Sequence, residues 1–365
     1  MMEIAILYST YINSASQIKN TAEAYFAQNK THHSASILPI TSGGRGFIDA
    51  MEAMPGTKTT RATTIARDRH SNPIETSYLI SHDGKTACIE CAKICGYDPG
   101  DNYCNPATTF THGIGDVILD ALSRNCRNFI IGIDGLATID AGMGMLNALG
   151  YKMHNEAGNE LQLYRGSEML RVHSVTDSRN TALLKRCRFT IAHNDNAAFY
   201  AATGPAALYA RQLGANEVTA DILDNGLRNM ASVYFHHNGR DVSYITAGGA
   251  GGAIAGAFAS FFNAKLRPAT SVLPGTAQIS KAMNNANAII IISHSITPTT
   301  ISSPAFASLM ATAKKSNAPI YHITTHIQNA PMLEAMDVRN ITPTDDPATE
   351  LVKLLDHIVP KLADE

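Results

Sequence analysis

Residues 128–150 have the sequence N-F-I-I-G-I-D-G-L-A-T-I-D-A-G-M-G-M-L-N-A-L-G. The apolar run at 129–133 is short, rich in isoleucine and interrupted only by Gly132, which is typical of a buried strand. A turn from Asp134 to Asp140 follows, in which Gly135 can take a positive φ angle. The stretch therefore predicts a strand and a turn, and the residues after the turn have a different periodicity.

A helix is predicted after the turn, because Met143, Leu146 and Leu149 recur at helical spacing. Gly150 occupies the position of a C-terminal cap, and Asp140 is the expected N-cap, with its carboxylate against unpaired backbone amides. A strand, a glycine-bearing turn and a helix N-terminus can together bind a phosphate or a carboxylate. The same pattern also describes a plain strand-to-helix turn, and both interpretations stay open.

The composition predicts a folded protein with room for two domains, since 45% of the 365 residues are hydrophobic and only 16% are charged. No apolar run reaches the roughly 18 residues of a membrane span, and the N-terminal sequence lacks the basic region of a signal peptide. We therefore predict a cytoplasmic protein with no membrane partner. A net charge of −2, without a basic stripe carrying aromatic residues, gives no reason to expect a nucleic-acid partner.

Four of the six cysteines, Cys88, Cys91, Cys95 and Cys104, are close together in the sequence. Closely spaced cysteines can hold zinc or an iron–sulfur cluster. The segment T-A-C-I-E-C, however, indicates a strand that would turn Cys88 and Cys91 to opposite faces. Because buried free cysteine packs as a small apolar side chain, we predict that these residues bind no metal.

Alternating strand and helix patterns at both ends of the chain predict a parallel, Rossmann-like sheet. Its strands are expected at 3–8, 35–40, 288–292 and 319–324, and its helices at 14–28, 48–54, 304–316 and 350–359, the last closed by Pro360. Between these ends, alternating segments at 59–66, 75–81 and 86–91 predict antiparallel strands. Helices at 113–123, 203–213 and 217–236, a strand at 188–193 and a helix ending near 265 complete the prediction. We therefore expect one Rossmann-like domain from residues 1–56 and 275–365, and an inserted α/β domain from residues 57–274.

Residues 132–145 resemble a motif of the glycerate kinases of the bacterial two-domain type, G-I-G-G-S-A-T-N-D-G-G-A-G-M. The matching residues are Gly132, Ile133, Gly135, Ala137, Thr138, Asp140, Gly142, Gly144 and Met145. The departures are Asp134, Leu136, Ile139, Ala141 and Met143, and Asp134 replaces a glycine. The resemblance extends over most of the chain. It implies the glycerate kinase fold and ATP-dependent phosphorylation of glycerate with magnesium.

Two N-terminal motifs of the family have lost their acids and a lysine. The first, P-D-S-Y-K-x-S-x-S-A, has Ser9 in place of the aspartate and Ile12 in place of the lysine. The second, A-D-G-G-E-G-T, is T-S-G-G-R-G-F at residues 41–47, with Ser42 for the aspartate and Arg45 for the glutamate. Its glycines Gly43, Gly44 and Gly46 are kept, which implies the same turn. Arg45 could bind an anion through two hydrogen bonds or be a solvated loop arginine.

The family segment C-D-V-T-N-P-L is H-N-D-N-A-A-F at residues 193–199, so that Asn194 replaces the aspartate and Asp195 stands one position late. Within a strand Asp195 would face the other side, whereas at a strand end the backbone could still bring it into the site. The lysine of the following family segment is Leu213. A glycine-rich family segment is retained as A-G-G-A-G-G-A-I-A-G at 247–256, where Gly249, Gly251 and Gly252 would allow close approach of a phosphate or of another helix.

The last family motif, T-G-E-G-x-x-D-x-Q-x-x-x-G-K, follows a buried strand. The corresponding sequence after Ile292 has no acid and no lysine between residues 293 and 313. His294 stands at the position of the glutamate and could titrate near neutral pH, or it could be a hydrogen-bonded loop residue. This segment departs furthest from the family.

The resemblance implies a site at the open face of an interdomain cleft, beyond the carboxyl ends of the strands. Its candidate catalytic residues are Asp140 and Asp195, and its candidate ligand-binding residues are Gly43, Gly44, Arg45, Gly46, Gly135, Thr138, Gly249, Gly251, Gly252 and His294. Phosphoryl transfer requires magnesium with oxygen ligands and cations around the transferred group, and most of the motif acids and lysines are replaced.

We therefore predict the family fold with impaired or absent phosphorylation of glycerate. ATP and magnesium are expected as cofactors only if activity remains, and a small-molecule hydroxy acid or another anion is the expected ligand. The alternative is a non-catalytic relative that binds a small anion or a protein partner in the cleft.

Overall fold

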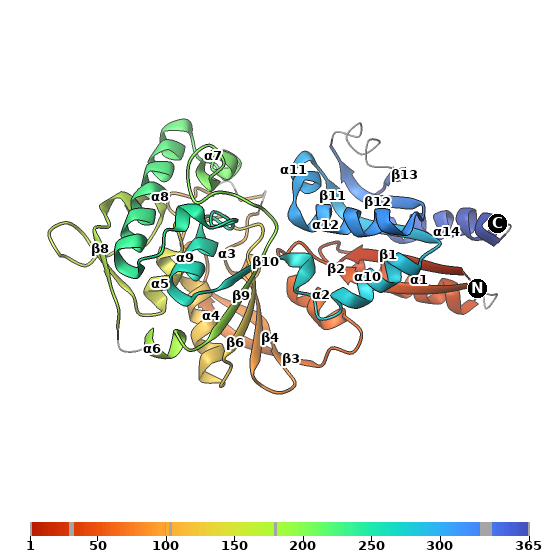
Figure 1. The fold of residues 1–365 in the computed structure, drawn as a ribbon, viewed down its shortest axis with the longest axis horizontal. Helices are drawn as coiled ribbons and strands as arrows, with labels where there is room; N and C mark the ends of the chain where they lie inside the picture. The colour runs from red at the N-terminus through yellow and green to blue at the C-terminus, as the bar shows by residue number, and fades with distance from the viewer. Residues whose placement is uncertain are drawn as a thin grey trace. The chain divides into compact units, whose positions relative to one another are not determined.

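The computed structural model describes residues 2–28, 33–98, 100–101, 104–178, 181–328 and 338–363. The chain divides into two compact units (Figure 1). Unit 1 contains residues 1–41, 49–57 and 270–365, and unit 2 contains residues 42–48 and 58–269. Compared with the ranges expected from the sequence, residues 42–48 belong to unit 2 and the return to unit 1 occurs at residue 270.

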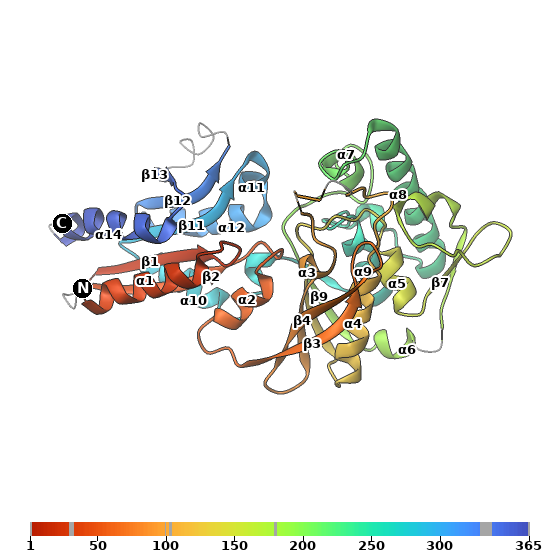
Figure 2. The same cartoon turned by 180° about the vertical axis from the view of Figure 1, so that it is seen from behind.

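Unit 1 is built on a parallel sheet of five strands in the order β13-β12-β11-β1-β2 (Figure 2). The strands are β1 (Met2–Ser9), β2 (His33–Ile40), β11 (Ala288–Ile296), β12 (Ile320–Ile327) and β13 (Val338–Pro343). β1 pairs with β11 from Ile4 opposite Ala288 to Tyr8 opposite Ile292. The two ends of the chain therefore share one sheet, as the sequence predicted.

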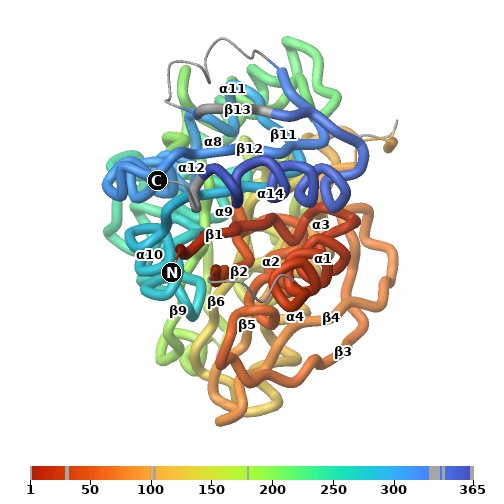
Figure 3. Tube along the Cα trace, turned by 90° about the vertical axis from the view of Figure 1, so that its right-hand side faces the viewer, coloured from red at the N-terminus to blue at the C-terminus, as the bar shows by residue number. Residues whose placement is uncertain are grey.

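Helices cover both faces of this sheet, and in Figure 3 α1 and α14 lie on one side of the strands with α10 and α12 on the other. The helices are α1 (Ala15–Gln28), α2 (Phe47–Ala53), α10 (Thr276–Asn285), α11 (Pro298–Ser302), α12 (Pro304–Ala313) and α14 (Pro347–Ala363). Ile4 and Ile6 of β1 pack with Ile18 of α1 and with Leu351 and Leu355 of α14. Burial of these alternate strand residues against helical stripes stabilises the layered α/β arrangement.

Unit 2 contains a sheet of six strands in the order β10-β9-β6-β5-β4-β3, and a small antiparallel pair, β7 and β8. The strands are β3 (Thr59–Arg67), β4 (Pro73–Ser81), β5 (Thr86–Glu90), β6 (Asn128–Gly132), β7 (Lys152–His154), β8 (Ser174–Thr176), β9 (Arg188–His193) and β10 (Lys265–Pro268). β3, β4 and β5 pair antiparallel, whereas β5, β6, β9 and β10 run parallel to one another. The carboxyl ends of β6 and β9 consequently lie at the same edge.

The helices of unit 2 are α3 (Ala92–Cys95), α4 (His112–Ser123), α5 (Met143–Ala148), α6 (Thr181–Leu184), α7 (Pro205–Tyr209), α8 (Glu217–Asn238) and α9 (Ile254–Phe262). Phe129 of β6 stacks on Phe189 of β9 with ring centroids 4.9 Å apart, and Phe189 packs on Phe258 of α9. This aromatic layer holds α9 against the two strands whose ends form the site described below.

Three local predictions were wrong. α5 begins at Met143 with Gly142 as its N-cap, because Ala141 and Gly142 both take positive φ angles and Asp140 lies before them. β11 continues to Ile296, since its pairing with β12 extends that far, so that His294 lies in a strand and not in a loop. α14 continues past Pro360 to Ala363, because a proline removes one backbone donor without ending a last helical turn.

Candidate functional site

Two polar residues stand in equivalent positions at the carboxyl edge of the unit 2 sheet. Gly132 of β6 is paired with Ala192 of β9, so that Asp134 and Asn194 each follow the paired residue by two positions. Ligands of α/β sheets bind beyond this edge. The register therefore brings Asp134 and Asn194 together, although they are far apart in the sequence.

Asp134 is the centre of a hydrogen-bonded group of side chains. Burial raises the pKa of its carboxyl group to about 6, although hydrogen bonds from the side chains of Ser42 and Asn194 and from the Gly135 amide oppose this shift. The nearby charge of Asp195 raises the pKa further. The carboxylate is enclosed while part of the residue stays accessible to solvent. A carboxyl group in this state can accept a hydroxyl proton near neutral pH.

Asp195 lies just beyond the end of β9, close enough for its charge to act on Asp134. Its carboxylate accepts a hydrogen bond from the Ala197 amide at 2.9 Å and another from the Tyr209 hydroxyl of α7. Burial raises the pKa of the Asp195 carboxyl group. The pKa of the Tyr209 hydroxyl is also raised, mainly by burial and further by the negative charges of Asp195 and Asp134. Of the two alternatives left open by the sequence, the strand end is the one observed, because β9 stops at His193.

A glycine turn at residues 43–46 packs directly on Asp134. The carbonyl oxygen of Gly43 accepts a hydrogen bond from the Asp134 amide at 3.2 Å. A side-chain carbon added to Gly44 would lie 3.1 Å from the Asp134 carbonyl oxygen, so the turn leaves little room for a larger residue there. Buried Glu90 holds the other end of the turn, accepting hydrogen bonds from the Gly46 and Ile48 amides, both at 3.2 Å.

Arg45 is the exposed residue of this turn. Its Nη2 donates to the carbonyl oxygen of Tyr97 at 2.9 Å, and the Tyr97 amide donates to the carbonyl oxygen of Gly135 at 2.8 Å. These two bonds place the guanidinium beside the turn that carries Asp134. A guanidinium has five N–H donors, so Arg45 keeps the capacity to bind an anion at this position.

Asp140 has a different environment from Asp134 and Asp195. It is fully buried, and its carboxylate accepts hydrogen bonds from the Thr111 amide and hydroxyl and from the Gly142 and Gly144 amides, at 2.7–3.3 Å. Burial raises the pKa of its carboxyl group to about 6. The expected contact with amides at a helix start is present, but every bond runs to the protein's own chain. This arrangement suits a structural role.

The glycine-rich segment serves close packing between chain segments. A side-chain carbon at Gly249 would lie 1.9 Å from the Ala198 carbonyl oxygen, and one at Gly252 would lie 1.8 Å from the Thr138 carbonyl oxygen. Gly251 has φ of +61° and lies against the Ile133 carbonyl oxygen. The segments that approach these glycines are loops, so the expected approach of another helix is not what the structure shows. Thr138 is buried beneath that contact.

His294 belongs to unit 1, where its ring lies edge-on to the Tyr11 ring with centroids 4.7 Å apart. Its Nδ1 lies 3.1 Å from the Thr325 hydroxyl, and burial lowers its pKa. The six cysteines are buried free thiols, and no cluster of three metal-ligating side chains occurs within the described ranges. The absence of a bound metal stays a prediction.

The structure thus groups six of the candidates in unit 2: Gly43, Gly44, Arg45 and Gly46 of one turn, Gly135 beside Asp134, and Asp195 after β9. Sequence reasoning missed Asp134, Ser42, Asn194 and Tyr209 as members of the same group. An available signal was the position of Asp134 and Asn194 immediately beyond the ends of two predicted parallel strands. Ser42 was marked by its place at a motif aspartate, whereas Tyr209 gave no comparable signal, because only the tertiary fold brings it close.

Comparisons with known proteins agree on one family. The model of the glycerate kinase family matches residues 10–364. The chain is 28% identical to glycerate 2-kinase of Escherichia coli K12 over 333 residues, covering 88% of this chain and 84% of that protein. It is 29% identical to glycerate kinase of Bacillus cereus ATCC 10987 over 255 residues, covering 69% and 66%.

A solved structure is also similar, a crystal structure described as a glycerate kinase 2 of Salmonella typhimurium LT2. The two chains are 25% identical, with a TM-score of 0.76, and the match covers 94% of this chain and 90% of that one. In the part of the chain that the structure describes, no helix combines the length and the apolar character needed to cross a membrane.

Proposed function

Because this chain belongs to the glycerate kinase family, we propose that its unit 2 binds a small hydroxy acid and that its ATP-dependent phosphorylation of glycerate is strongly impaired. One observation supports the binding: exposed Arg45 is held through Tyr97 beside Gly135, at the edge of the sheet that also carries the carboxyl groups of Asp134 and Asp195. A guanidinium pairs with a carboxylate through two parallel hydrogen bonds. Aspartate oxygens accept hydrogen bonds from hydroxyl groups.

The carboxylates of this site are ligands of the type that magnesium prefers, since hard oxygen donors are its usual ligands and one or two carboxylates suffice beside phosphate groups. Asp134 and Asp195 would hold the ion, which would supply positive charge to phosphate oxygens. Positive side chains are scarce in the segments that correspond to the family motifs. Among the glycine turn, residues 134–140, residues 194–204 and the glycine-rich segment, Arg45 is the single lysine or arginine. Phosphoryl transfer depends on such cations, and this deficit supports the proposal of impaired turnover.

The binding half of the proposal is tested by calorimetry with D-glycerate. The affinity is expected to fall by about tenfold in Arg45→Gln, the loss of one charge-assisted hydrogen-bonded pair. The matched control is Arg211→Gln, which removes an exposed arginine of the same unit that pairs with Glu217. Propionate, which lacks both hydroxyls, should bind more weakly than D-glycerate, because the two carboxyl groups lose their partners. Equal affinities of parent and Arg45→Gln would refute this site.

A second candidate function is an active kinase with rearranged acids, and Asp134 favours it. The side chains of Ser42 and Asn194, which stand where the family motifs have aspartates, both donate to Asp134. Two carboxyl groups, Asp134 and Asp195, thus occupy the region from which two motif acids were lost. This arrangement keeps a carboxyl group that could accept the proton of an attacking hydroxyl.

A coupled assay with ATP, magnesium and D-glycerate separates the two candidates. Turnover of roughly 1 s⁻¹ or more, lost in Asp134→Asn, would establish the rearranged kinase. A trace rate that is equal in parent and Asp134→Asn would indicate a contaminating enzyme and would leave the binding function as the conclusion. A cytoplasmic location remains a prediction from the sequence.

A further inference from the structure

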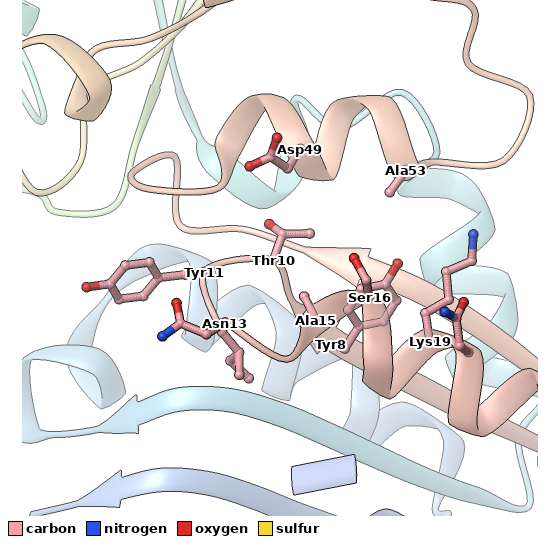
Figure 4. Close-up of a pocket in the computed structure, with 11 residues that line it drawn as sticks. Tyr8, Thr10, Tyr11, Asn13, Ala15, Ser16, Lys19, Asp49 and Ala53 are labelled. Carbon is pink, nitrogen blue, oxygen red and sulfur yellow. The ribbon is translucent and has the colours of Figure 1, made fainter. Parts of the chain in front are cut away.

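The polar pocket of unit 1 coincides with a family motif. It lies between α2 and the segment that leads from β1 into α1, and Figure 4 shows Asp49 on one side of it, with Thr10 and Ser16 on the other. Ile12 of its lining stands at the position of the lysine in the first family motif. A charged group outside the motif segments is found instead in unit 2, in the turn that joins β3 to β4.

Arg69 lies in this turn, and its side chain is largely enclosed. It is 17% exposed and forms an ion pair with Asp101, whose side chain is 15% exposed. The turn is held by the Asp68 carboxylate, which accepts hydrogen bonds from the His70 and Asn72 amides, both at 2.8 Å. The Arg69 guanidinium therefore projects from a turn that is itself fixed by hydrogen bonds.

A second contact of Arg69 holds one peptide unit. Its Nη1 donates to the Gly96 carbonyl oxygen at 2.9 Å. The Tyr97 amide, at the other end of the same peptide, donates to the Gly135 carbonyl oxygen at 2.8 Å. Because a peptide unit is planar, hydrogen bonds at its two opposite ends fix its orientation. Arg69 supplies one of these two bonds, and the turn that carries Gly135 supplies the other.

Arg45 is bound to the next carbonyl group along the chain. Its Nη2 donates to the Tyr97 carbonyl oxygen at 2.9 Å. The peptide that Arg69 holds is joined to this carbonyl through Tyr97 alone, so its orientation limits the directions in which the carbonyl can point. We propose that Arg69 is a positioning residue, which orients the Arg45 guanidinium through the Gly96–Tyr97 peptide. This role rests on the function proposed for unit 2, in which Arg45 binds the carboxylate of the ligand.

The two contacts of Arg69 require a guanidinium. Its planar fork of donors serves the Asp101 carboxylate and the Gly96 carbonyl at the same time, whereas the ammonium of lysine is a compact charge on a flexible stem. Arg69→Lys should therefore keep the charge beside Asp101 and release the Gly96 carbonyl. The Ala137 amide still donates to the Cys95 carbonyl oxygen at 2.9 Å, so the segment stays in place and only the orientation of the peptide is freed.

Calorimetric titration of the full chain with D-glycerate measures the consequence. Arg69→Lys should weaken binding by about fivefold, the loss of one hydrogen bond. In the Arg45→Gln background the same substitution should leave the affinity unchanged, because the group that Arg69 positions is absent. The control is Arg67→Lys, which alters a neighbouring guanidinium paired with Asp116 of α4 and should keep the parent affinity. An equal loss with and without Arg45 would overturn the proposal.

Hydrogen exchange of the Tyr97 amide tests the same role without a ligand. Labelling with 15N-tyrosine restricts the NMR spectrum to the 13 tyrosine amides of the chain. Arg69→Lys should speed the exchange of Tyr97 by about fivefold. Tyr151, whose amide donates to the Leu146 carbonyl oxygen at 2.9 Å in the same unit, should keep its rate.

Two results of the exchange measurement would refute the positioning role. An unchanged rate at Tyr97 would show that Arg69 does not hold the peptide, and an equal acceleration at Tyr97 and Tyr151 would show a general loss of stability. Failure of the parent to bind D-glycerate would refute the function proposed for unit 2, and the exchange of Tyr97 would then decide the role of Arg69 by itself.

Discussion

Asp140→Ala distinguishes a structural from a catalytic carboxylate. The substitution leaves three backbone amides and the Thr111 hydroxyl without their acceptor in a fully buried place. The same Thr111 hydroxyl accepts a hydrogen bond from the Met145 amide at 2.9 Å, so the start of α5 and the start of α4 are held by one network. We expect the substitution to act on the stability of unit 2.

The magnitude follows from the four bonds and from the cost of the buried charge. At about 1.5 kcal/mol for each hydrogen bond, their loss amounts to about 6 kcal/mol. In the folded protein the pKa of Asp140 is raised from 3.8 to about 6. The Asp140 carboxyl group therefore stabilises the folded state most below its unfolded pKa, and this contribution is lost as the pH rises through 6. The charge costs the folded state about 2 kcal/mol at pH 5 and about 3 kcal/mol at pH 8. Asp140→Ala should therefore lower the free energy of unfolding by about 4 kcal/mol at pH 5 and about 3 kcal/mol at pH 8.

Urea unfolding followed by far-UV circular dichroism measures this cost, since the chain has no tryptophan for fluorescence. The transitions of the two units are fitted separately where they differ. Asp140→Asn, which keeps one acceptor oxygen, should cost less than Asp140→Ala. An unchanged unfolding midpoint in Asp140→Ala, together with loss of D-glycerate binding, would show that Asp140 acts on the ligand and that the reasoning is wrong.

Three further predictions concern unit 2. Gly252→Ala should lower the free energy of unfolding by about 2–4 kcal/mol, because its new carbon would overlap the Thr138 carbonyl oxygen. The control in the same urea unfolding measurement is Gly239→Ala, which has a similar positive φ and open space around it and should cost about 1 kcal/mol. Glu90→Gln should weaken D-glycerate binding in calorimetry by a few-fold, since it loosens the glycine turn; an unchanged affinity would mean that the turn does not need this anchor. The pKa of Asp134 is raised to about 6, so the parent's stability relative to Asp134→Asn should fall as the pH rises from 4 to 7 in urea titrations, and a rise would contradict the sign.

The strands and most helices could be predicted from the sequence because their signals are local. The isoleucine-rich run at 129–133 and the apolar segment at 188–193 predicted β6 and β9 almost to the residue. Errors occurred where a distant segment decides the local structure. β10 was not expected, and its four residues become a strand by pairing with β9. β11 was predicted to end at Ile292 but continues along β12.

The sequence alone determined the family of the fold and the retained glycine turn, and it predicted the replacement of motif acids and lysines, because these are properties of residues at fixed positions along the chain. Only the tertiary structure decided which acids share a site. It brought Asp134 between Ser42 and Asn194, and it placed Asp140 among four donors of its own chain. The physical reason is that the environment of a carboxylate depends on burial and on partners from other strands, and strand pairing in a parallel sheet joins segments that the sequence keeps far apart.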